Sequence, residues 1–268
     1  MWVYDLNDQR LKIFFAPHLP EAITPNFCGL FQQCQVFALE HSSFDEVDDK
    51  EVEWNDAAQG IEEYEPSPLS PFHLFSAKLA KTVFNSRKSV VLERSPITNS
   101  EADTTTSLFT KSRNYWGRAK FEDATRLLGE YLESFAAECD LRDRSYASQL
   151  RDMLGRFRDQ KILAMRGALH YEILPDLLDG LDVQCENMTW IPNCVFTLLE
   201  EGTLRLLHGG KIDQDELVRI HIQADFTPVE PPYSAMLAAR NKVGAMSAKD
   251  VTNYRNDLAM HPKIPSDS

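Results

Sequence analysis

Apolar residues recur at helical spacing through the middle of the chain. One run, with members three and four residues apart, comprises Tyr146, Leu150, Met153, Leu154 and Phe157. This spacing places its members on one face of a helix. The phase slips across Arg158–Lys161 and resumes with Ile162, Met165, Leu169 and Ile173. Pro175 then ends the pattern, because proline lacks the amide proton that a helix needs. The spacing predicts two helices, or one kinked helix, over Ser145–Leu174.

Similar patterns predict helices on both sides of this run. The clearest covers Glu122–Ala137, a second covers Cys194–Leu207, and weaker ones cover Phe72–Phe84 and Tyr233–Leu258. The threonine-rich stretch Thr98–Thr106 has no such period and is typical of a loop. We therefore expect a mainly α protein, with a helical core domain at residues 72–260 and a flexible tail at residues 261–268.

The first 44 residues mix strand and turn signals. Leu11–Phe15 is a short β-prone run that Pro17 and Pro20 end, and Phe31–Leu39 alternates into another strand or a short helix. The segment also has several aromatic residues of its own. It predicts a small N-terminal module that contains β-structure, at residues 1–44.

Residues 45–71 differ in composition from both neighbouring segments. Between Glu40 and Glu65 the chain holds eleven acidic residues and a single basic one, Lys50. Like charges at this density repel one another and keep a segment solvated. The run from Pro66 to Pro71 favours an extended polyproline spacer. The composition predicts an acidic, proline-rich linker or loop.

The whole chain is acidic, with a formal net charge of −13 and a pI near 5.0. Nucleic-acid affinity comes largely from cations that neutralise phosphates, so this charge argues against nucleic acid as a partner. It also argues against an anionic membrane surface, and no apolar run approaches the ~20 residues that span a bilayer. Five scattered cysteines and the lack of a signal peptide indicate a reducing compartment with buried thiols. We expect a protein of the cytoplasm, or of the nucleus, that is not secreted.

The sequence carries no motif for nucleotide, metal or acyl-transfer chemistry. Its seven histidines are far apart and never at metal-ligand spacing with one another or with cysteine. His170 and Glu172 are two residues apart, so on a helix they would point to different faces and could not act on one atom. We therefore expect no catalytic residue, no cofactor and no metal site, and the protein is predicted to be non-enzymatic.

Partner binding is the remaining class of function, and two sets of residues are candidates. Phe14, Phe15 and Phe31 lie in short segments with little surrounding sequence to bury them, and aromatic groups left at a surface mark interfaces. The alternative is that these phenylalanines form the core of their own module. Pro68 and Pro71 form one of two PxxP spacings that an SH3-type groove could bind, and a simple spacer is the alternative.

Several short strings of the central stretch resemble one viral family. They are Arg158-Asp159-Gln160, Leu163-Ala164-Met165-Arg166, Leu174-Pro175, Val183-Gln184-Cys185, Pro192-Asn193 and Leu199-Glu200-Glu201. In this order, mainly over residues 158–206, they are similar to phlebovirus (phenuivirus) non-structural proteins NSs. The tryptophan-proline-leucine-glycine string and the acidic C-terminal tail of some members are missing, so functions tied to those motifs do not carry over.

The resemblance implies a virulence factor that binds host signalling or transcription proteins and suppresses the interferon response. Such a protein acts by contact with host components of innate immunity in the infected cell, and could self-associate. Two other interpretations stay open: a cellular helical adaptor, and an enzyme whose active site is assembled from dispersed residues. A deep pocket with converging polar groups would favour the enzyme.

Overall fold

The computed structural model describes residues 2–6, 10–16, 18, 20–40, 47–66, 73–178, 183–187, 197–227 and 233–263. The chain separates into two compact units, each made from two stretches of sequence. Unit 1 comprises residues 1–99 and 139–194, and unit 2 comprises residues 100–138 and 195–268. One boundary falls inside the long helix α5 (Phe121–Arg156), between Glu138 and Cys139.

Unit 1 is built around a mixed β-sheet, in which six strands of the described chain follow the order β4-β3-β5-β2-β1-β6. Four of them run parallel: β4 (Ser89–Glu93), β3 (Val36–Glu40), β5 (Ile162–Gly167) and β2 (Leu11–Ala16). β1 (Trp2–Leu6) is antiparallel to β2, and β6 (Val183–Asn187) is antiparallel to β1. Ala164 of β5 pairs with Ala38 on one side and with Ile13 on the other, at the centre of the sheet.

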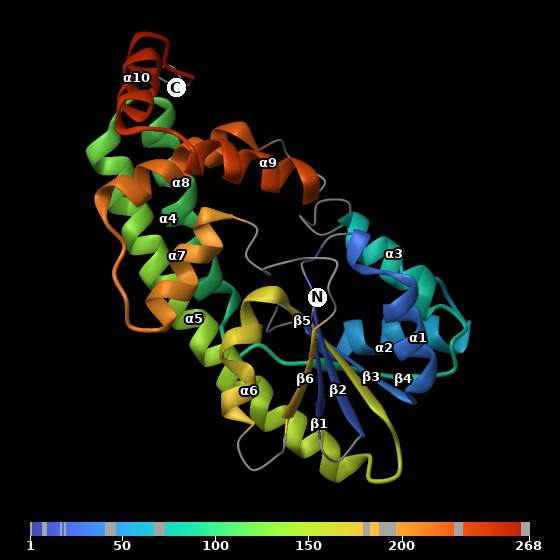
Figure 1. The fold of residues 1–268 in the computed structure, drawn as a ribbon. Helices are drawn as coiled ribbons and strands as arrows, with labels where there is room; N and C mark the ends of the chain where they lie inside the picture. The colour runs from blue at the N-terminus through green and yellow to red at the C-terminus, as the bar shows by residue number, and fades with distance from the viewer. Residues whose placement is uncertain are drawn as a thin grey trace. The chain divides into compact units, whose positions relative to one another are not determined.

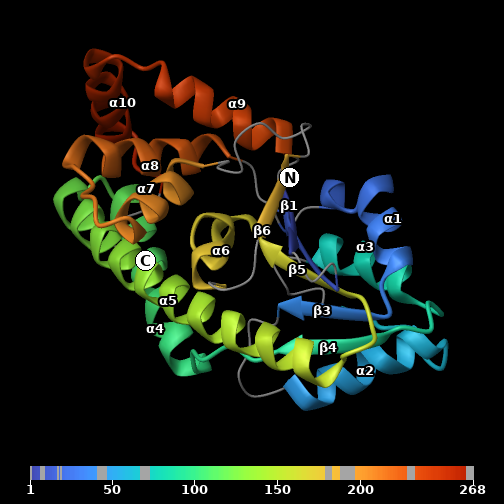
Figure 2. The same cartoon turned by 60° about the horizontal axis from the view of Figure 1, so that its bottom comes forward.

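Helices cover both faces of this sheet (Figures 1 and 2). On one face lie α1 (Pro25–Gln33), α2 (Val47–Gln59) and α3 (His73–Val83), packed on side chains that include Phe14 and Phe37. The other face is covered by the C-terminal part of α5 and by the short α6 (Leu174–Leu177). Short 3-10 helices at Pro20–Ala22 (η1) and Ala168–Glu172 (η2) follow β2 and β5. Because both faces are buried, the central strands are apolar at nearly every position.

The regular elements in the described residues of unit 2 are all helices. It consists of α4 (Asn99–Gly117), the first part of α5, α7 (Leu198–Leu207), α8 (Gln214–Phe226), α9 (Tyr233–Gly244) and α10 (Ala248–Met260). Thr197, Asp213 and Ser247 begin α7, α8 and α10 with capping boxes, in which side chains satisfy the unpaired amides of the first turn. Trp116, Ile222 and Val251 are buried where these helices meet.

The described chain is mostly helical, as the periodicity predicts, but unit 1 is an α/β structure. Strands from the first 40 residues pair in one sheet with β4, β5 and β6. The prediction of a separate module at residues 1–44 and a helical core domain at 72–260 is therefore wrong. The sheet needs segments from both parts of the chain, and strands and helices alternate through unit 1.

The helices predicted at Glu122–Ala137 and in the first half of Ser145–Leu174 are confirmed, and both belong to α5. The second half is wrong, because Ile162–Gly167 is strand β5. The phase slip at Arg158–Lys161 marks the turn from helix to strand. The loop predicted at Thr98–Thr106 is also wrong, since these residues lie almost wholly in α4.

The segment predicted as a linker, residues 45–71, contains helix α2. Its acidic side chains share the helix with a buried face formed by Val47, Trp54, Ala57 and Ala58. That face packs against the sheet core, and the apolar area it removes from water stabilises the helix. The acidic composition therefore reflects the outer face of a packed helix, and the linker prediction is wrong over Val47–Gln59.

Candidate functional site

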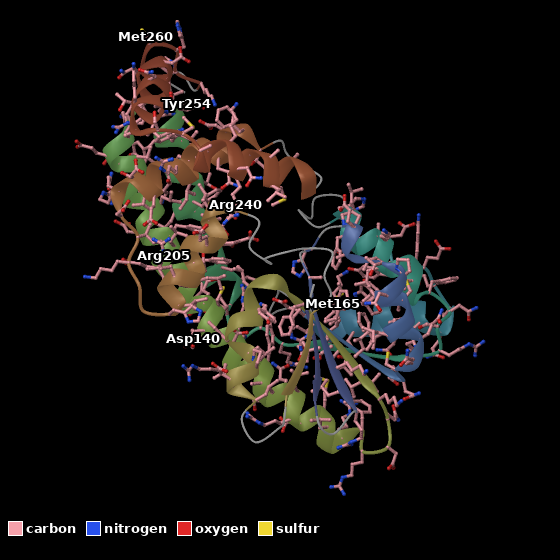
Figure 3. All side chains as sticks on the ribbon, in the orientation of Figure 1. Asp140, Met165, Arg205, Arg240, Tyr254 and Met260 are labelled. Atoms are coloured by element: carbon pink, nitrogen blue, oxygen red, sulfur yellow. The ribbon has the colours of Figure 1, made fainter. Side chains whose placement is uncertain are left out.

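Charged residues stand at the carboxyl ends of three parallel strands. Glu40 ends β3, Glu93 ends β4, and Arg166 is next to last in β5; Met165, beside it, is labelled in Figure 3. The chain leaves β2 and β3 toward the face covered by α1–α3, but leaves the intervening β5 toward the face covered by α6. Connections that diverge in this way mark the strand ends at which α/β proteins bind ligands. This edge is the first candidate site.

At this edge His170, in η2, links two carboxylates. Its Nε2 lies 3.1 Å from Glu40 Oε1, and its Nδ1 lies 2.7 Å from Asp143 Oδ1 on α5. The other oxygen of Glu40 accepts a hydrogen bond of 3.0 Å from the Gly167 amide. The side chains of His170, Glu40 and Asp143 are only 6%, 9% and 1% exposed. The cluster is therefore closed to solvent and joins β3, η2 and α5.

The two carboxylates determine the protonation state of His170. Burial alone would lower the pKa of the imidazole, but the charge of Glu40 and hydrogen bonds to Asp143 and Glu40 raise it to about 10. Burial alone would raise the pKa of Glu40, but the charge and hydrogen bond of His170 hold it well below its ordinary value. At neutral pH His170 is thus an imidazolium with both ring nitrogens protonated. In this form the ring can donate to both carboxylates.

A second ion pair, between Arg166 and Glu93, lies nearby with both side chains fully buried. It joins β5 to β4 across the intervening β3. The guanidinium also donates a hydrogen bond of 2.6 Å to the Met165 carbonyl and lies over the ring of Tyr146, 5.1 Å from its centroid. Burial lowers the pKa of Arg166 to about 10, which leaves it charged at neutral pH. The pair joins the strand ends in the interior of unit 1.

Unit 2 has its own buried polar cluster, centred on Asp225 of α8. Asp225 Oδ2 accepts hydrogen bonds from Trp116 Nε1 and from the Tyr254 hydroxyl, each 2.8 Å long, and Oδ1 pairs with Arg113. His221 stacks on the Trp116 indole with 4.5 Å between ring centroids. Burial and the Arg113 charge lower the pKa of His221 to about 3, so this imidazole stays neutral. The cluster ties α4, α8 and α10 together.

A pocket of about 210 Å³ borders that cluster. Its lining includes the apolar side chains of Phe109, Leu199 and Ile220, beside Arg113 and His221. Its volume is below the ~300–1,000 Å³ typical of ligand sites. The guanidinium of Arg113 could hold a polar substrate, but it is already bonded to His221 and Asp225. We therefore assign no catalytic role to this pocket.

The phenylalanines proposed for partner binding are core residues. Phe14 and Phe15 are 0% exposed and Phe31 is 3% exposed. Phe14 packs edge-on against Phe27 with centroids 5.0 Å apart, and Phe31 contacts Phe37 in the same way at 5.2 Å. Their assignment to a surface is wrong, and the alternative that they form a core is confirmed. Pro68 and Pro71 lie outside the described residues.

Four of the large apolar side chains that reach solvent lie on α2, in the segment after it, on α3 and directly after α3. They are Val52, Ile61, Leu74 and Phe84, which are 59%, 72%, 53% and 39% exposed. We call these four residues the α2–α3 surface. Glu62, Glu63 and Glu65, which follow Ile61 in the sequence, are also exposed. Large apolar groups that remain exposed are candidates for contact with another protein.

A groove of about 480 Å³ lies beside α3. One wall is the segment after α2, formed by Glu63, Tyr64, Glu65 and Pro66. The other wall consists of His73, Ala77, Ala80, Lys81 and Phe84. We call it the α3 groove. Its volume falls within the range of sites that bind small molecules or peptide side chains.

Other features bear on the class of function. Within the described ranges, no cluster of three histidine, cysteine or acidic side chains could hold a metal ion. Nor does any helix of the described chain combine the length and apolar character needed to cross a bilayer. Cys34 and Cys139 are buried thiols, as predicted, whereas Cys28 is half-buried. Burial raises the pKa of Cys34 to about 11, so its thiol is not a ready nucleophile.

Sequence reasoning missed the strand-end cluster and set His170 aside. Glu40, Glu93 and Arg166 each follow a short apolar run, in the strings VFALE, SVVLE and ILAMRG. The carboxyl ends of parallel strands meet at one edge, so these charges could have been grouped once the three runs were recognised as strands. Asp143 could not be grouped with them in this way, because it lies in the middle of α5 and not at the end of a strand.

Comparison with protein-family models, curated proteins and solved structures found no match for this chain.

Proposed function

We propose that this chain is a non-enzymatic virulence factor that binds host signalling or transcription proteins and suppresses the interferon response. The NSs-like strings suggest the biological role. The observation that carries the binding mode is the α2–α3 surface, where four large apolar side chains are exposed, two of them within the acidic segment. Interfaces concentrate their energy in a few buried apolar anchors, and these residues provide them. The proposed place of action is the host cytoplasm or nucleus.

The electrostatics of the two buried clusters support contact rather than catalysis. His170 remains charged and His221 remains neutral across the physiological pH range, so neither changes protonation where a general acid or base must. Both are enclosed by hydrogen bonds and ion pairs within their own unit. Their role in this proposal is to hold the units in shape, and binding belongs to exposed side chains.

An interferon-promoter reporter in interferon-competent cells tests the proposal. The variant Val52→Ser/Ile61→Ser/Leu74→Ser should lose suppression, because it removes three apolar contacts from the α2–α3 surface. The matched control is Leu141→Ser/Met260→Ser, which changes exposed apolar residues elsewhere, 51% and 69% exposed, and should suppress normally. Both variants should keep the urea midpoint of the unchanged chain, since surface substitutions shift stability by about 0.5 kcal/mol or less.

Two outcomes count against the proposal. If the unchanged chain leaves the reporter fully active, the interferon role is wrong, and a cellular adaptor with the same surface becomes the better interpretation. If the chain suppresses and both variants suppress equally, the role stands but the α2–α3 surface does not carry it.

A further inference from the structure

The α3 groove has a defined shape because both of its walls are held in place. Gly60 adopts a left-handed conformation with φ of 72°, and the Ile61 amide donates a 2.9 Å hydrogen bond to the Asp56 carbonyl. Tyr64 then stacks on Trp54 of α2, with 4.2 Å between ring centroids, and Trp54 is itself buried. These contacts fix the chain after α2 opposite α3. A preformed groove loses less entropy on binding than a mobile one.

The floor of the groove is apolar and one rim is acidic. The apolar part of the lining consists of Ala77 and Ala80 from α3, Phe84 directly after α3, and Tyr64 with Pro66 on the other wall. On the Tyr64 side, exposure alternates: Glu63 and Glu65 are exposed, whereas Tyr64 and Pro66 are half-buried. The two carboxylates therefore stand on the open side of their wall, two residues apart, and they take part in none of the ion pairs found between described residues. Lys81 is the exposed cation on the opposite wall.

The dimensions suit a short extended chain. The lining of α3 runs from His73 to Phe84, which is about 16 Å along a helix at ~1.5 Å per residue. An extended peptide rises ~3.3 Å per residue, so about five residues span that length. Alternate side chains of an extended peptide point in opposite directions. One set can enter the apolar floor while the other meets the rim, and the rim carboxylates call for positive charge there.

We infer that the α3 groove binds a short extended peptide segment in which basic residues alternate with apolar ones. The apolar side chains pack against Ala77, Ala80 and Phe84, and the basic ones pair with Glu63 and Glu65. This inference rests on the proposed function, since it names the chemistry of the partner segment that a contact-based inhibitor would hold. The α3 groove and the α2–α3 surface share only Phe84.

The test is direct binding of a labelled peptide, Arg-Leu-Arg-Leu-Arg, to the full chain, followed by fluorescence anisotropy. Two further peptides separate the contributions: Arg-Ser-Arg-Ser-Arg lacks the apolar anchors and Glu-Leu-Glu-Leu-Glu reverses the charge. We expect saturable binding of the first, at least tenfold weaker binding of the second, and none of the third. Equal binding of Arg-Ser-Arg-Ser-Arg would overturn the inference, because it would mean attraction by net charge alone.

Variants locate the binding to the groove. Glu63→Lys/Glu65→Lys should weaken the binding of Arg-Leu-Arg-Leu-Arg at least tenfold, and Phe84→Ser should weaken it at least fivefold. The control Glu133→Lys/Asp152→Lys makes the same change in net charge at exposed positions of α5 and should weaken it less than threefold. Equal losses in the two charge variants, or no loss in Phe84→Ser, would refute the groove assignment. So would a dimer of the unchanged chain that Glu63→Lys/Glu65→Lys converts to monomer in sedimentation, because a second copy would then be the occupant.

The reporter and the peptide assay fail independently. A chain that suppresses the interferon reporter but does not bind Arg-Leu-Arg-Leu-Arg refutes this inference and leaves the proposed function in place. If the chain binds the peptide in the groove but leaves the reporter active, the proposed function is refuted and the assignment of the groove as a peptide site stands.

Discussion

Replacing His170 with alanine should destabilise the chain strongly. The substitution removes the cation between Glu40 and Asp143, whose side chains are only 9% and 1% exposed. Breaking a buried ion pair by removing one partner typically costs about 3–5 kcal/mol, because the remaining charge is left uncompensated. Whole domains are stable by about 5–15 kcal/mol, so the loss is a large part of the total. The same carboxylates cannot reach water without opening η2 or α5.

Urea denaturation followed by circular dichroism measures this loss. The matched control is His208→Ala, which removes an exposed histidine and should change the free energy of unfolding by about 0.5 kcal/mol or less. Part of the His170→Ala effect comes from lost packing against Tyr146, whose ring centroid lies 5.6 Å from the imidazole. Adding Glu40→Gln and Asp143→Asn separates the two contributions, because it neutralises the stranded carboxylates and should recover about 1 kcal/mol or more. A His170→Ala chain as stable as the control, or a triple variant with no recovery, would refute the electrostatic account.

Two further predictions concern pH and the core. The pKa of His170 in the folded chain, about 10, is above the ordinary 6.5, so its stabilisation is fully present below pH 6.5 and is lost as pH rises through 10. The stability difference between the unchanged chain and His170→Ala should therefore shrink from pH 7 to pH 10 in urea titrations, and a constant difference would contradict the assigned charge. Phe14→Ala should lower the free energy of unfolding by about 3–5 kcal/mol, since its ring is fully buried, and a midpoint within the error of the unchanged chain would show that Phe14 is not a core residue.

The helical periodicity predicted α5 well and failed at β5. A helix with one buried face repeats every three or four residues, and α5 buries Tyr146, Leu150 and Met153 in that way. Strand β5 is buried on both faces, so all residues from Ile162 to Arg166 are buried and no period of two appears. Ile162 and Met165 then match a helical spacing by coincidence. A short apolar run is ambiguous between strand and helix until its partners are known.

The acidic segment shows a different failure, in which composition was given more weight than spacing. Val47, Trp54 and Ala58 are seven and four residues apart, which is the period of a helix with one buried side. The acids occupy the remaining positions of α2, where charge is solvated at little cost.

The candidate groove could not be found from the sequence either. Tyr64 and Phe84 are twenty residues apart in the sequence. The stacking of Tyr64 on Trp54 and the hydrogen bond from the Asn85 amide to the Ala57 carbonyl bring the segment after α2 close to α3.

The place of β5 in the sheet has a consequence for how the chain folds. β5 lies between β2 and β3, yet roughly 120 residues separate it from the end of β3. Synthesis proceeds at ~5–20 residues per second, so β2 and β3 wait on the order of ten seconds for the strand that joins them. During that interval their edges are unpaired and exposed to other chains. Residues 100–138 of unit 2 are therefore synthesised before unit 1 can complete its sheet.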